Sequence, residues 1–107
     1  MGNPTRDGQY AVIFPNQFSG EDGEGYKAMA ERMVELAAEQ PGCLGLDSAR
    51  GPDGFGITVS YWVSLEAIET WRDVSEHLEA QRLGRDKWYE TFDLHVAKIE
   101  KSYSFTK

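Results

Sequence analysis

Hydrophobic residues recur along the chain with two different spacings, and these spacings predict the first elements. Residues 10–14 are apolar at every position and rich in strand-favouring types, which predicts a strand covered on both faces. After an acidic, glycine-rich loop, apolar residues recur at helical spacing between 26 and 37. This predicts an amphipathic helix that ends before Pro41, because proline cannot continue the helical hydrogen-bond ladder.

A β-hairpin is predicted next. Residues 44–49 and 55–63 are candidate strands, and segment 50–54 between them contains the proline and glycines of a tight turn. Along the second strand the side chains alternate, so that one face is apolar and the other mixed. The apolar face holds Ile57, Val59 and Tyr61, and the mixed face holds Thr58, Ser60 and Trp62.

The rest of the chain predicts a second helical region and a final strand. Ser64 is a typical N-cap residue, and the apolar residues after it share one helical face. We expect this helix to break near residue 73 and a further helix to begin near residue 75. Apolar and polar residues then alternate from 92 to about 99, which predicts the last strand.

The order strand, helix, strand, strand, helix, strand predicts an α+β protein with a ferredoxin-like βαββαβ fold. In this fold two main helices cover one face of a four-stranded antiparallel sheet. The first strand is apolar on both sides, and Trp62 is expected on the bare side of the third strand. That side would expose more apolar surface than soluble monomers tolerate, so we expect a homodimer through the sheet face. Residues 1–8 are expected to be a mobile N-terminal segment, and residues 9–107 a single domain.

Charge and composition exclude several classes of function. The chain has 107 residues and a net charge of -7, which repels phosphate backbones and anionic lipids, so neither nucleic acid nor membrane is an expected partner. No apolar run reaches membrane-spanning length and the start lacks a signal peptide, which predicts a cytoplasmic protein. The single cysteine, Cys43, allows no internal disulfide, and no set of metal ligands is visible.

Three stretches of the sequence resemble the antibiotic biosynthesis monooxygenase family. They are the first strand at 10–14, the passage QPGCLG at 40–45 and the strand-to-helix passage YWVSLEAIETW at 61–71. The likeness covers roughly residues 9–103 and implies a dimeric α/β barrel. Family members include cofactor-independent oxygenases of electron-rich aromatic polyketides, haem-degrading enzymes and proteins of unknown activity. The resemblance therefore implies a pocket more than one particular reaction.

One branch of this family can be compared residue by residue. The haem-degrading members have an asparagine on the first strand, a tryptophan on the second helix and a histidine ligand ten residues after that tryptophan. Asn16 and Trp71 match the first two, and Gln81 stands at the third. Because glutamine is not a normal ligand of haem iron, the resemblance argues against haem of that type, and no cofactor is expected.

The candidate catalytic residues are Asn16, Trp71 and His77. The Asn16 amide could hold a substrate oxygen or a developing oxyanion, and Trp71 could stack on a flat aromatic substrate. His77 could remove a phenolic proton, because imidazole is the side chain that titrates nearest to neutral pH. Each keeps a structural alternative: a turn or bulge residue, a core residue and a solvent-facing helix residue, respectively.

Two further residues, Trp62 and Arg82, are candidates for substrate binding. Arg82 could hold an acidic or phenolate oxygen, or it could belong to a salt-bridged, exposed helix face. We expect a cofactor-independent, monooxygenase-like enzyme that uses O₂ and a small electron-rich aromatic compound, such as a phenol or hydroquinone. A non-catalytic dimeric module that binds a small molecule is the alternative, and a haem-degrading monooxygenase is a third hypothesis.

Overall fold

The sheet of the computed structural model is built around β1 (Tyr10–Phe18). Along one edge β1 pairs antiparallel with β3 (Phe55–Trp62), which in turn pairs with β2 (Cys43–Arg50). Along its other edge β1 pairs with β4 (Tyr89–Phe92) and then β5 (His95–Lys98). The structure describes residues 5–81 and 88–107, without the side chains of 76–81.

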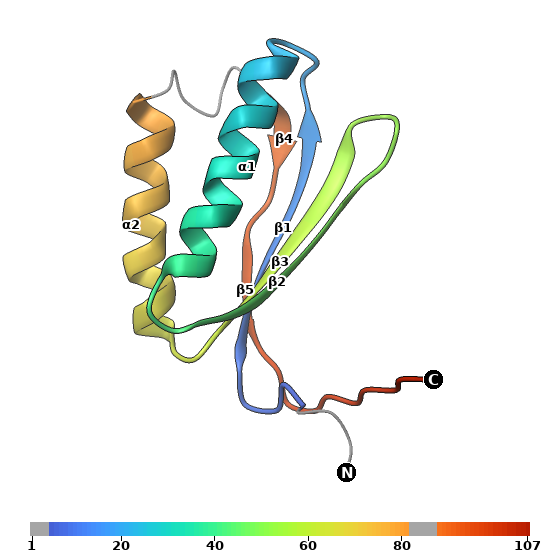
Figure 1. Ribbon diagram of the computed structural model, residues 1–107, viewed down its shortest axis with the longest axis vertical. Helices are drawn as coiled ribbons and strands as arrows, with labels where there is room; N and C mark the ends of the chain where they lie inside the picture. Colours follow the sequence, from blue (N-terminus) through green and yellow to red (C-terminus); the bar gives the residue numbers. More distant parts are fainter. Residues whose placement is uncertain (1–4, 82–87) are drawn as a thin grey trace.

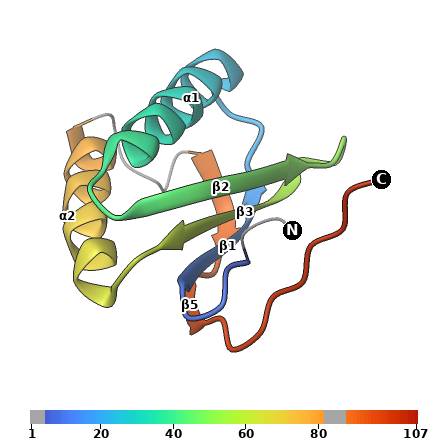
Figure 2. The ribbon, with the colours of Figure 1, turned by 60° about the horizontal axis from the view of Figure 1, so that its bottom comes forward.

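Both helices lie on the same face of this sheet (Figure 1). α1 (Gly23–Glu39) follows Asp22, whose carboxylate accepts a hydrogen bond from the Gly25 N–H at 3.2 Å. α2 (Leu65–Gln81) follows Ser64, whose hydroxyl accepts from the Ala67 N–H at 3.1 Å. Figure 2 shows the helices again on one side of the strands, and no described helix on the other. The predicted ferredoxin-like α+β fold is confirmed, with β4 and β5 sharing the place of the fourth strand.

Among the residues that the structure describes, no helix is both long enough and apolar enough to cross a membrane.

The first strand is longer than predicted. It does not end near residue 14 but continues through Pro15 to Phe18, and over this stretch it pairs with both β3 and β4. Asn16 is a paired residue inside the strand, opposite Gly56 on β3 and Phe92 on β4. Asn16 is therefore not a turn residue, and the irregularity in the pairing of β1 with β4 lies after it, between Gln17 and Phe18.

The second helix and the last strand also differ from their predicted bounds. α2 runs without a break through residue 73, and the Ser75 hydroxyl donates to the Arg72 carbonyl oxygen at 3.0 Å, which satisfies a polar group inside the helix. The last strand begins at Tyr89 and is divided into β4 and β5 by residues 93 and 94. Alternation of side chains alone did not reveal either feature.

The register of the sheet decides which side chains face the helices. Side chains directly opposite in antiparallel strands share a face, and so do residues two positions apart on one strand. Val12 is opposite Ser60, so Val12, Ser60 and Trp62 lie on the same face of the sheet. Trp62 is 0% exposed, and its ring stacks on that of Trp71 in α2 with centroids 6.3 Å apart. The expectation that Trp62 lies on the bare face is therefore wrong. The mixed face of β3 is turned to the helices, and its apolar face, which carries Ile57, is turned away.

The core beneath α2 is centred on Trp62. Trp62, Val12 and Ile68 form the buried cluster, with Trp71 packed against it. The indole N–H of Trp62 donates to the Ser60 hydroxyl oxygen at 2.8 Å, so this buried donor is satisfied. The tryptophan thus joins β3 to α2 and also orients a polar side chain of the strand.

Gly42 brings the connection between α1 and β2 against this core. Its φ is +88°, and an added Cβ would lie 2.7 Å from the Cβ of Ala67 and 2.8 Å from Cγ1 of Val63. Its carbonyl oxygen accepts a hydrogen bond from the Val63 N–H at 2.8 Å. The chain passes this closely to the start of α2 because the position has no side chain.

The two ends of the described chain differ in their contacts with the rest of the fold. The Gly8 N–H donates to the Ile99 carbonyl oxygen at 2.8 Å, and the Arg6 guanidinium lies 3.8 Å from the centroid of the Tyr61 ring. The C-terminal segment instead runs away from the sheet (Figures 1 and 2), and Tyr103 within it is 84% exposed. The core is therefore complete without the C-terminal residues.

Trp62→Ala is expected to lower the free energy of unfolding by about 3–5 kcal/mol, because it empties the centre of the core and leaves Ser60 without its donor. Urea denaturation monitored by circular dichroism measures this change. Leu65→Ala, at a side chain that is 48% exposed, is the control and is expected to cost less than about 1 kcal/mol. Equal effects of the two substitutions would contradict the assignment of Trp62 to the core.

Candidate functional site

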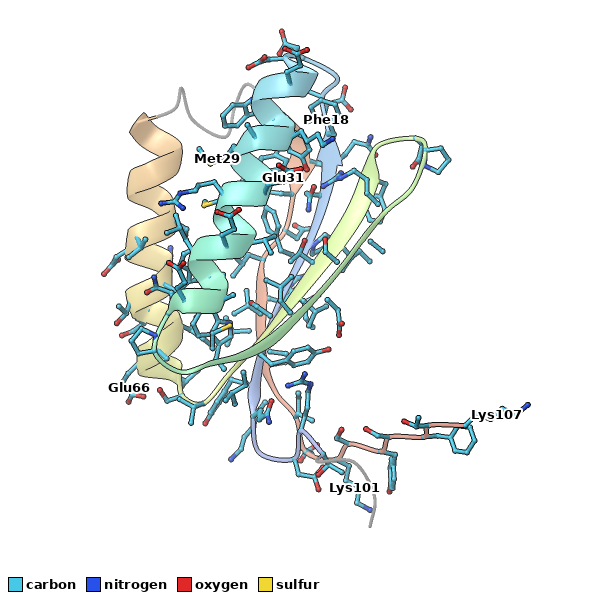
Figure 3. The ribbon with its side chains drawn as sticks, viewed as in Figure 1. Phe18, Met29, Glu31, Glu66, Lys101 and Lys107 are labelled. Carbon is cyan, nitrogen blue, oxygen red and sulfur yellow. The ribbon has the colours of Figure 1, made fainter. Side chains whose placement is uncertain are left out.

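A cavity of about 400 Å³ lies between α1 and the helix-facing side of the sheet. Met29 and Met33 of α1, Phe14 and Asn16 of β1, and Trp71 of α2 all contribute to its walls. Figure 3 shows side chains filling the space between helices and strands, with Met29 labelled on α1. A mainly apolar cavity with a few polar groups is the usual form of a site for a small organic ligand.

Three neighbouring strands bring the polar groups of this cavity together. Gly56 of β3 is opposite Asn16 of β1 on one side and Arg50 of β2 on the other, so these residues form a row across the sheet. An added Cβ at Gly56 would lie 2.9 Å from the guanidinium carbon of Arg50. Because this side chain is missing, Arg50 extends over β3 and its Nη2 donates a hydrogen bond to Oδ1 of Asn16. We call Asn16, Gly56 and Arg50 the polar row.

Asn16 is 2% exposed, and both polar atoms of its amide have partners. Oδ1 accepts from Arg50, and Nδ2 donates to the Phe14 carbonyl oxygen at 3.0 Å. An amide nitrogen carries a second N–H, so Asn16 retains donor capacity at the wall of the cavity that it lines. A buried amide held in this way is already oriented for a ligand.

Arg50 is held by neutral acceptors. Besides Asn16, its guanidinium donates to the Tyr26 hydroxyl oxygen and to the Gly54 carbonyl oxygen. Its central carbon lies 5.2 Å from the centroid of the Tyr26 ring. No carboxylate in the described ranges lies within ion-pair distance of Arg50. The side chain therefore brings an uncompensated positive charge to the wall of the cavity.

Aromatic rings from β1 and β4 fix the position of Tyr26. Its ring stacks on that of Phe18, with centroids 4.3 Å apart, and meets the ring of Tyr89 edge-on at 5.9 Å. Tyr89 in turn meets Phe14 edge-on at 5.6 Å. These contacts hold the Tyr26 hydroxyl where the Arg50 guanidinium reaches it.

Burial raises the pKa of Tyr26 above its ordinary value near 10. The charge of Arg50, its hydrogen bond and the hydrogen bond from Tyr89 all lower this pKa, but desolvation outweighs them. Tyr26 therefore remains a neutral phenol at physiological pH, and it leaves the charge of Arg50 uncompensated.

The polar side chains on the mixed face of β3 line the cavity. The hydroxyl groups of Ser48 and Thr58 lie 3.0 Å apart, and Ser60 accepts the indole N–H of Trp62. Ser48, Thr58 and Ser60 all line the cavity. The polar residues that break the apolar pattern of β3 thus belong to the cavity and not to solvent.

The predicted residues Asn16 and Trp71 line this one cavity. Trp62, which was expected to contact substrate, lies instead behind Trp71 with 0% of its surface exposed, so it can support the wall but offers no surface to a ligand. The register between β1 and β3 places the Trp62 side chain on the helix-facing side of the sheet, within the core.

The remaining predicted residues fall where the structure gives no side chains. His77 and Gln81 belong to α2, but their side chains are outside the described set, and Arg82 lies in the undescribed range 82–87. Elsewhere in the described chain, no three His, Cys, Asp or Glu side chains gather as metal ligands.

Sequence reasoning missed Arg50 and Tyr26. Arg50 belongs to β2 and not to the hairpin turn, and its contact with Asn16 spans 34 positions of sequence. Trp88 was also missed; it lines the cavity at 4% exposure, and its indole N–H has no acceptor among the residues described. A glycine inside the predicted strand 55–63, at Gly56, was the one available signal, because such a glycine often marks a close approach.

Arg50→Gln is expected to raise the pKa of Tyr26 further, because it removes a positive charge and a hydrogen bond that favour the tyrosinate. Carbon-13 NMR of protein with labelled tyrosines, recorded over alkaline pH, measures this pKa. Tyr26→Phe assigns the signal, and Arg32→Gln is the control at an exposed arginine. In the wild type the folded state holds this proton more tightly than the unfolded chain, so Tyr26 makes stability fall as pH rises above about 10. An unchanged or lowered pKa in Arg50→Gln would contradict the contact.

Comparisons with known proteins identify the family of the chain. Residues 10–83 match the family described as antibiotic biosynthesis monooxygenase. The uncharacterized protein YqjZ of Bacillus subtilis (strain 168) is 51% identical over 96 residues, which span 90% of this chain and 83% of YqjZ.

Solved structures show the same fold at low identity. Rv0793 from Mycobacterium tuberculosis is similar with a TM-score of 0.74 and 15% identity, over 90% of this chain and 99% of Rv0793. SnoaB, a cofactor-independent oxygenase from Streptomyces nogalater, is similar with a TM-score of 0.72 and 14% identity, over 89% of this chain and 96% of SnoaB. The family model matches most of the length of this chain, and YqjZ is 51% identical to it. The chain therefore belongs to the antibiotic biosynthesis monooxygenase family.

Proposed function

We propose that this protein is a cofactor-independent monooxygenase that acts on a small electron-rich aromatic compound, such as a phenol or hydroquinone. The observation that carries the proposal is that the Asn16 amide and the Trp71 ring line one cavity with aromatic and methionine walls. Family membership supports it, as does the fold shared with SnoaB, which is described as a cofactor-independent oxygenase.

The proposed reaction needs no group that the chain itself does not supply. The phenol loses its proton, and the anion passes one electron to O₂; the resulting radical pair combines to form a carbon–oxygen bond. The peroxide then loses water to leave a quinone, so that one phenol and one O₂ give one quinone and one water. The protein must bind and orient the ring, stabilise the anion and exclude water.

The roles proposed for the site residues follow from this sequence of steps. Trp71 supplies a flat wall against which the ring lies, and Asn16 donates its remaining amide N–H to an oxygen of the anion or the peroxide. His77 on α2 is the proposed base. Arg50 and Tyr26 complete the polar end of the cavity and keep Asn16 in place.

A non-catalytic module that binds an aromatic ligand is the second candidate. It is favoured by one observation: none of the cavity-lining side chains in the described part of the chain is a histidine or a cysteine. The ionisable groups that do line it, on Tyr26, Lys27, Glu31, Arg50 and Tyr89, include no buried base.

The dimer is also a proposal. Members of this family typically form dimers, and the bare face of the sheet carries apolar side chains, of which Phe55 and Ile57 are 44% and 42% exposed. Their opposite residues on β1, Gln17 and Pro15, extend the same surface. A second copy that packs on this face would remove this apolar area from water.

Asn16→Ala and Trp71→Ala are each expected to lower substrate-dependent oxygen uptake by about 100-fold or more, because they remove the oxyanion donor and the aromatic wall. Uptake by metal-free protein is measured with an oxygen electrode against phenols and hydroquinones, and product mass is followed with labelled O₂. Leu65→Ala, at a side chain that is 48% exposed and does not line the cavity, serves as the control. Full uptake by either folded variant would rule out the assigned roles, and absence of uptake in the wild type with ligand binding retained would favour the binding module.

Ile57→Asp is expected to convert the dimer to monomer without unfolding it, because a charge at a side chain already 42% exposed in one subunit costs little until a partner covers it. Analytical ultracentrifugation gives the mass. Leu65→Asp adds the same charge at a side chain that is 48% exposed on α2, and it should leave the dimer intact. A dimer that persists in Ile57→Asp would exclude the bare sheet face as the interface.

A further inference from the structure

We propose that Arg50 makes the cavity selective for phenolate over phenol, so that the substrate is held as its anion by a fixed charge. The ligand class is a phenol of one or two rings, and the proton that the phenol loses ends in bulk water. This inference rests on the proposed function, and it names the form in which the proposed substrate binds.

The first argument is the charge that Arg50 keeps. Its three hydrogen-bond acceptors, on Asn16, Tyr26 and Gly54, are all neutral. The ion pair between Arg32 and Glu35 lies elsewhere, on α1, where both side chains are more than half exposed. A cation without a counter-ion beside a cavity attracts an anionic ligand at short range, although the chain as a whole carries a net charge of -7.

The second argument is the hydrogen-bond capacity of the guanidinium. Its acceptors bind N–H groups of Nη1 and Nη2, and the remaining N–H groups, including that of Nε, make no hydrogen bond to a described residue. The Asn16 amide beside it has a second N–H as well. A phenolate oxygen accepts several hydrogen bonds, so the polar row offers both charge and donors to one oxygen.

The third argument weighs the other charged groups that face Arg50 across the cavity. From α1 these are Tyr26, which is neutral, and Lys27 and Glu31, which are exposed and of opposite sign. From β4 there is Tyr89. The described lining residues of β1, β3 and α2 are uncharged. Among the described groups, Arg50 therefore sets the sign of the field at the polar row.

The surroundings strengthen this field. The walls beside the polar row are aromatic and aliphatic, so part of the space around a bound oxygen has a low dielectric constant, in which a charge acts further than in water. A volume of about 400 Å³ is near the lower end for ligand cavities, which fits one or two aromatic rings.

The test is the pKa of a bound phenol, measured without O₂ so that binding is separated from turnover. 4-Nitrophenol and 4-nitro-1-naphthol are the probes, because the absorbance of their phenolates reports ionisation directly. In excess wild-type protein the apparent pKa of the better-bound probe should fall by about one unit or more, which corresponds to tenfold tighter binding of the anion. Arg50→Gln should abolish the fall, and Arg50→Lys should restore most of it because the charge returns.

Two further variants complete the design. Arg32→Gln removes the same charge from a side chain that is 54% exposed, and it should leave the shift intact. Gly56→Ala keeps the charge but crowds the guanidinium, and it should reduce the shift. Circular dichroism and thermal melting establish that each variant is folded.

The outcomes separate this inference from the proposed function. Absence of binding by both probes, absence of a shift in the wild type, or a shift that survives Arg50→Gln would overturn the role of Arg50, whatever the oxygen uptake. A shift that depends on Arg50, in a protein that consumes no oxygen with any phenol, would support the inference and identify a phenolate-binding module.

Discussion

The site depends on the hydrogen bond by which Arg50 reaches Asn16 across Gly56. Without it, an asparagine that is 2% exposed would have an amide oxygen without a partner, and such a burial costs about 1–3 kcal/mol. The bond forms because the residue between the two has no Cβ. As a result, the guanidinium of Arg50, which belongs to the edge strand β2, reaches towards the central strand β1 and lies beside an apolar cavity.

The rest of the fold supplies what this contact requires. Trp62 and Trp71 fix α2 against the sheet, and Gly42 lets the α1–β2 connection pass beneath the start of α2. Stacking between Phe18 and Tyr26 holds the start of α1 beside the end of β1. The cavity is what remains between these fixed parts. Its shape is therefore set by packing on both sides, and its polarity is set by the polar row.

The sequence predicted the fold because element order depends on local patterns, and spacing alone identified both helices and the hairpin. It predicted that Asn16 and Trp71 share a site through resemblance to a family. It failed for Trp62, since alternation tells which residues share a face but not which face meets the helices. It also failed for Arg50, whose role depends on register across three strands and on a glycine between. Such pairings are made by tertiary structure, which no single segment encodes.

The measurement that tests the central claim most directly is a crystal structure of the protein with 4-nitrophenol bound above the pKa of the probe. The account predicts the phenolate oxygen within hydrogen-bond distance of the Arg50 guanidinium and the Asn16 amide, with the ring against Trp71. A ring bound in the cavity with its oxygen turned away from Arg50, or an Arg50 side chain that does not cross Gly56, would contradict it.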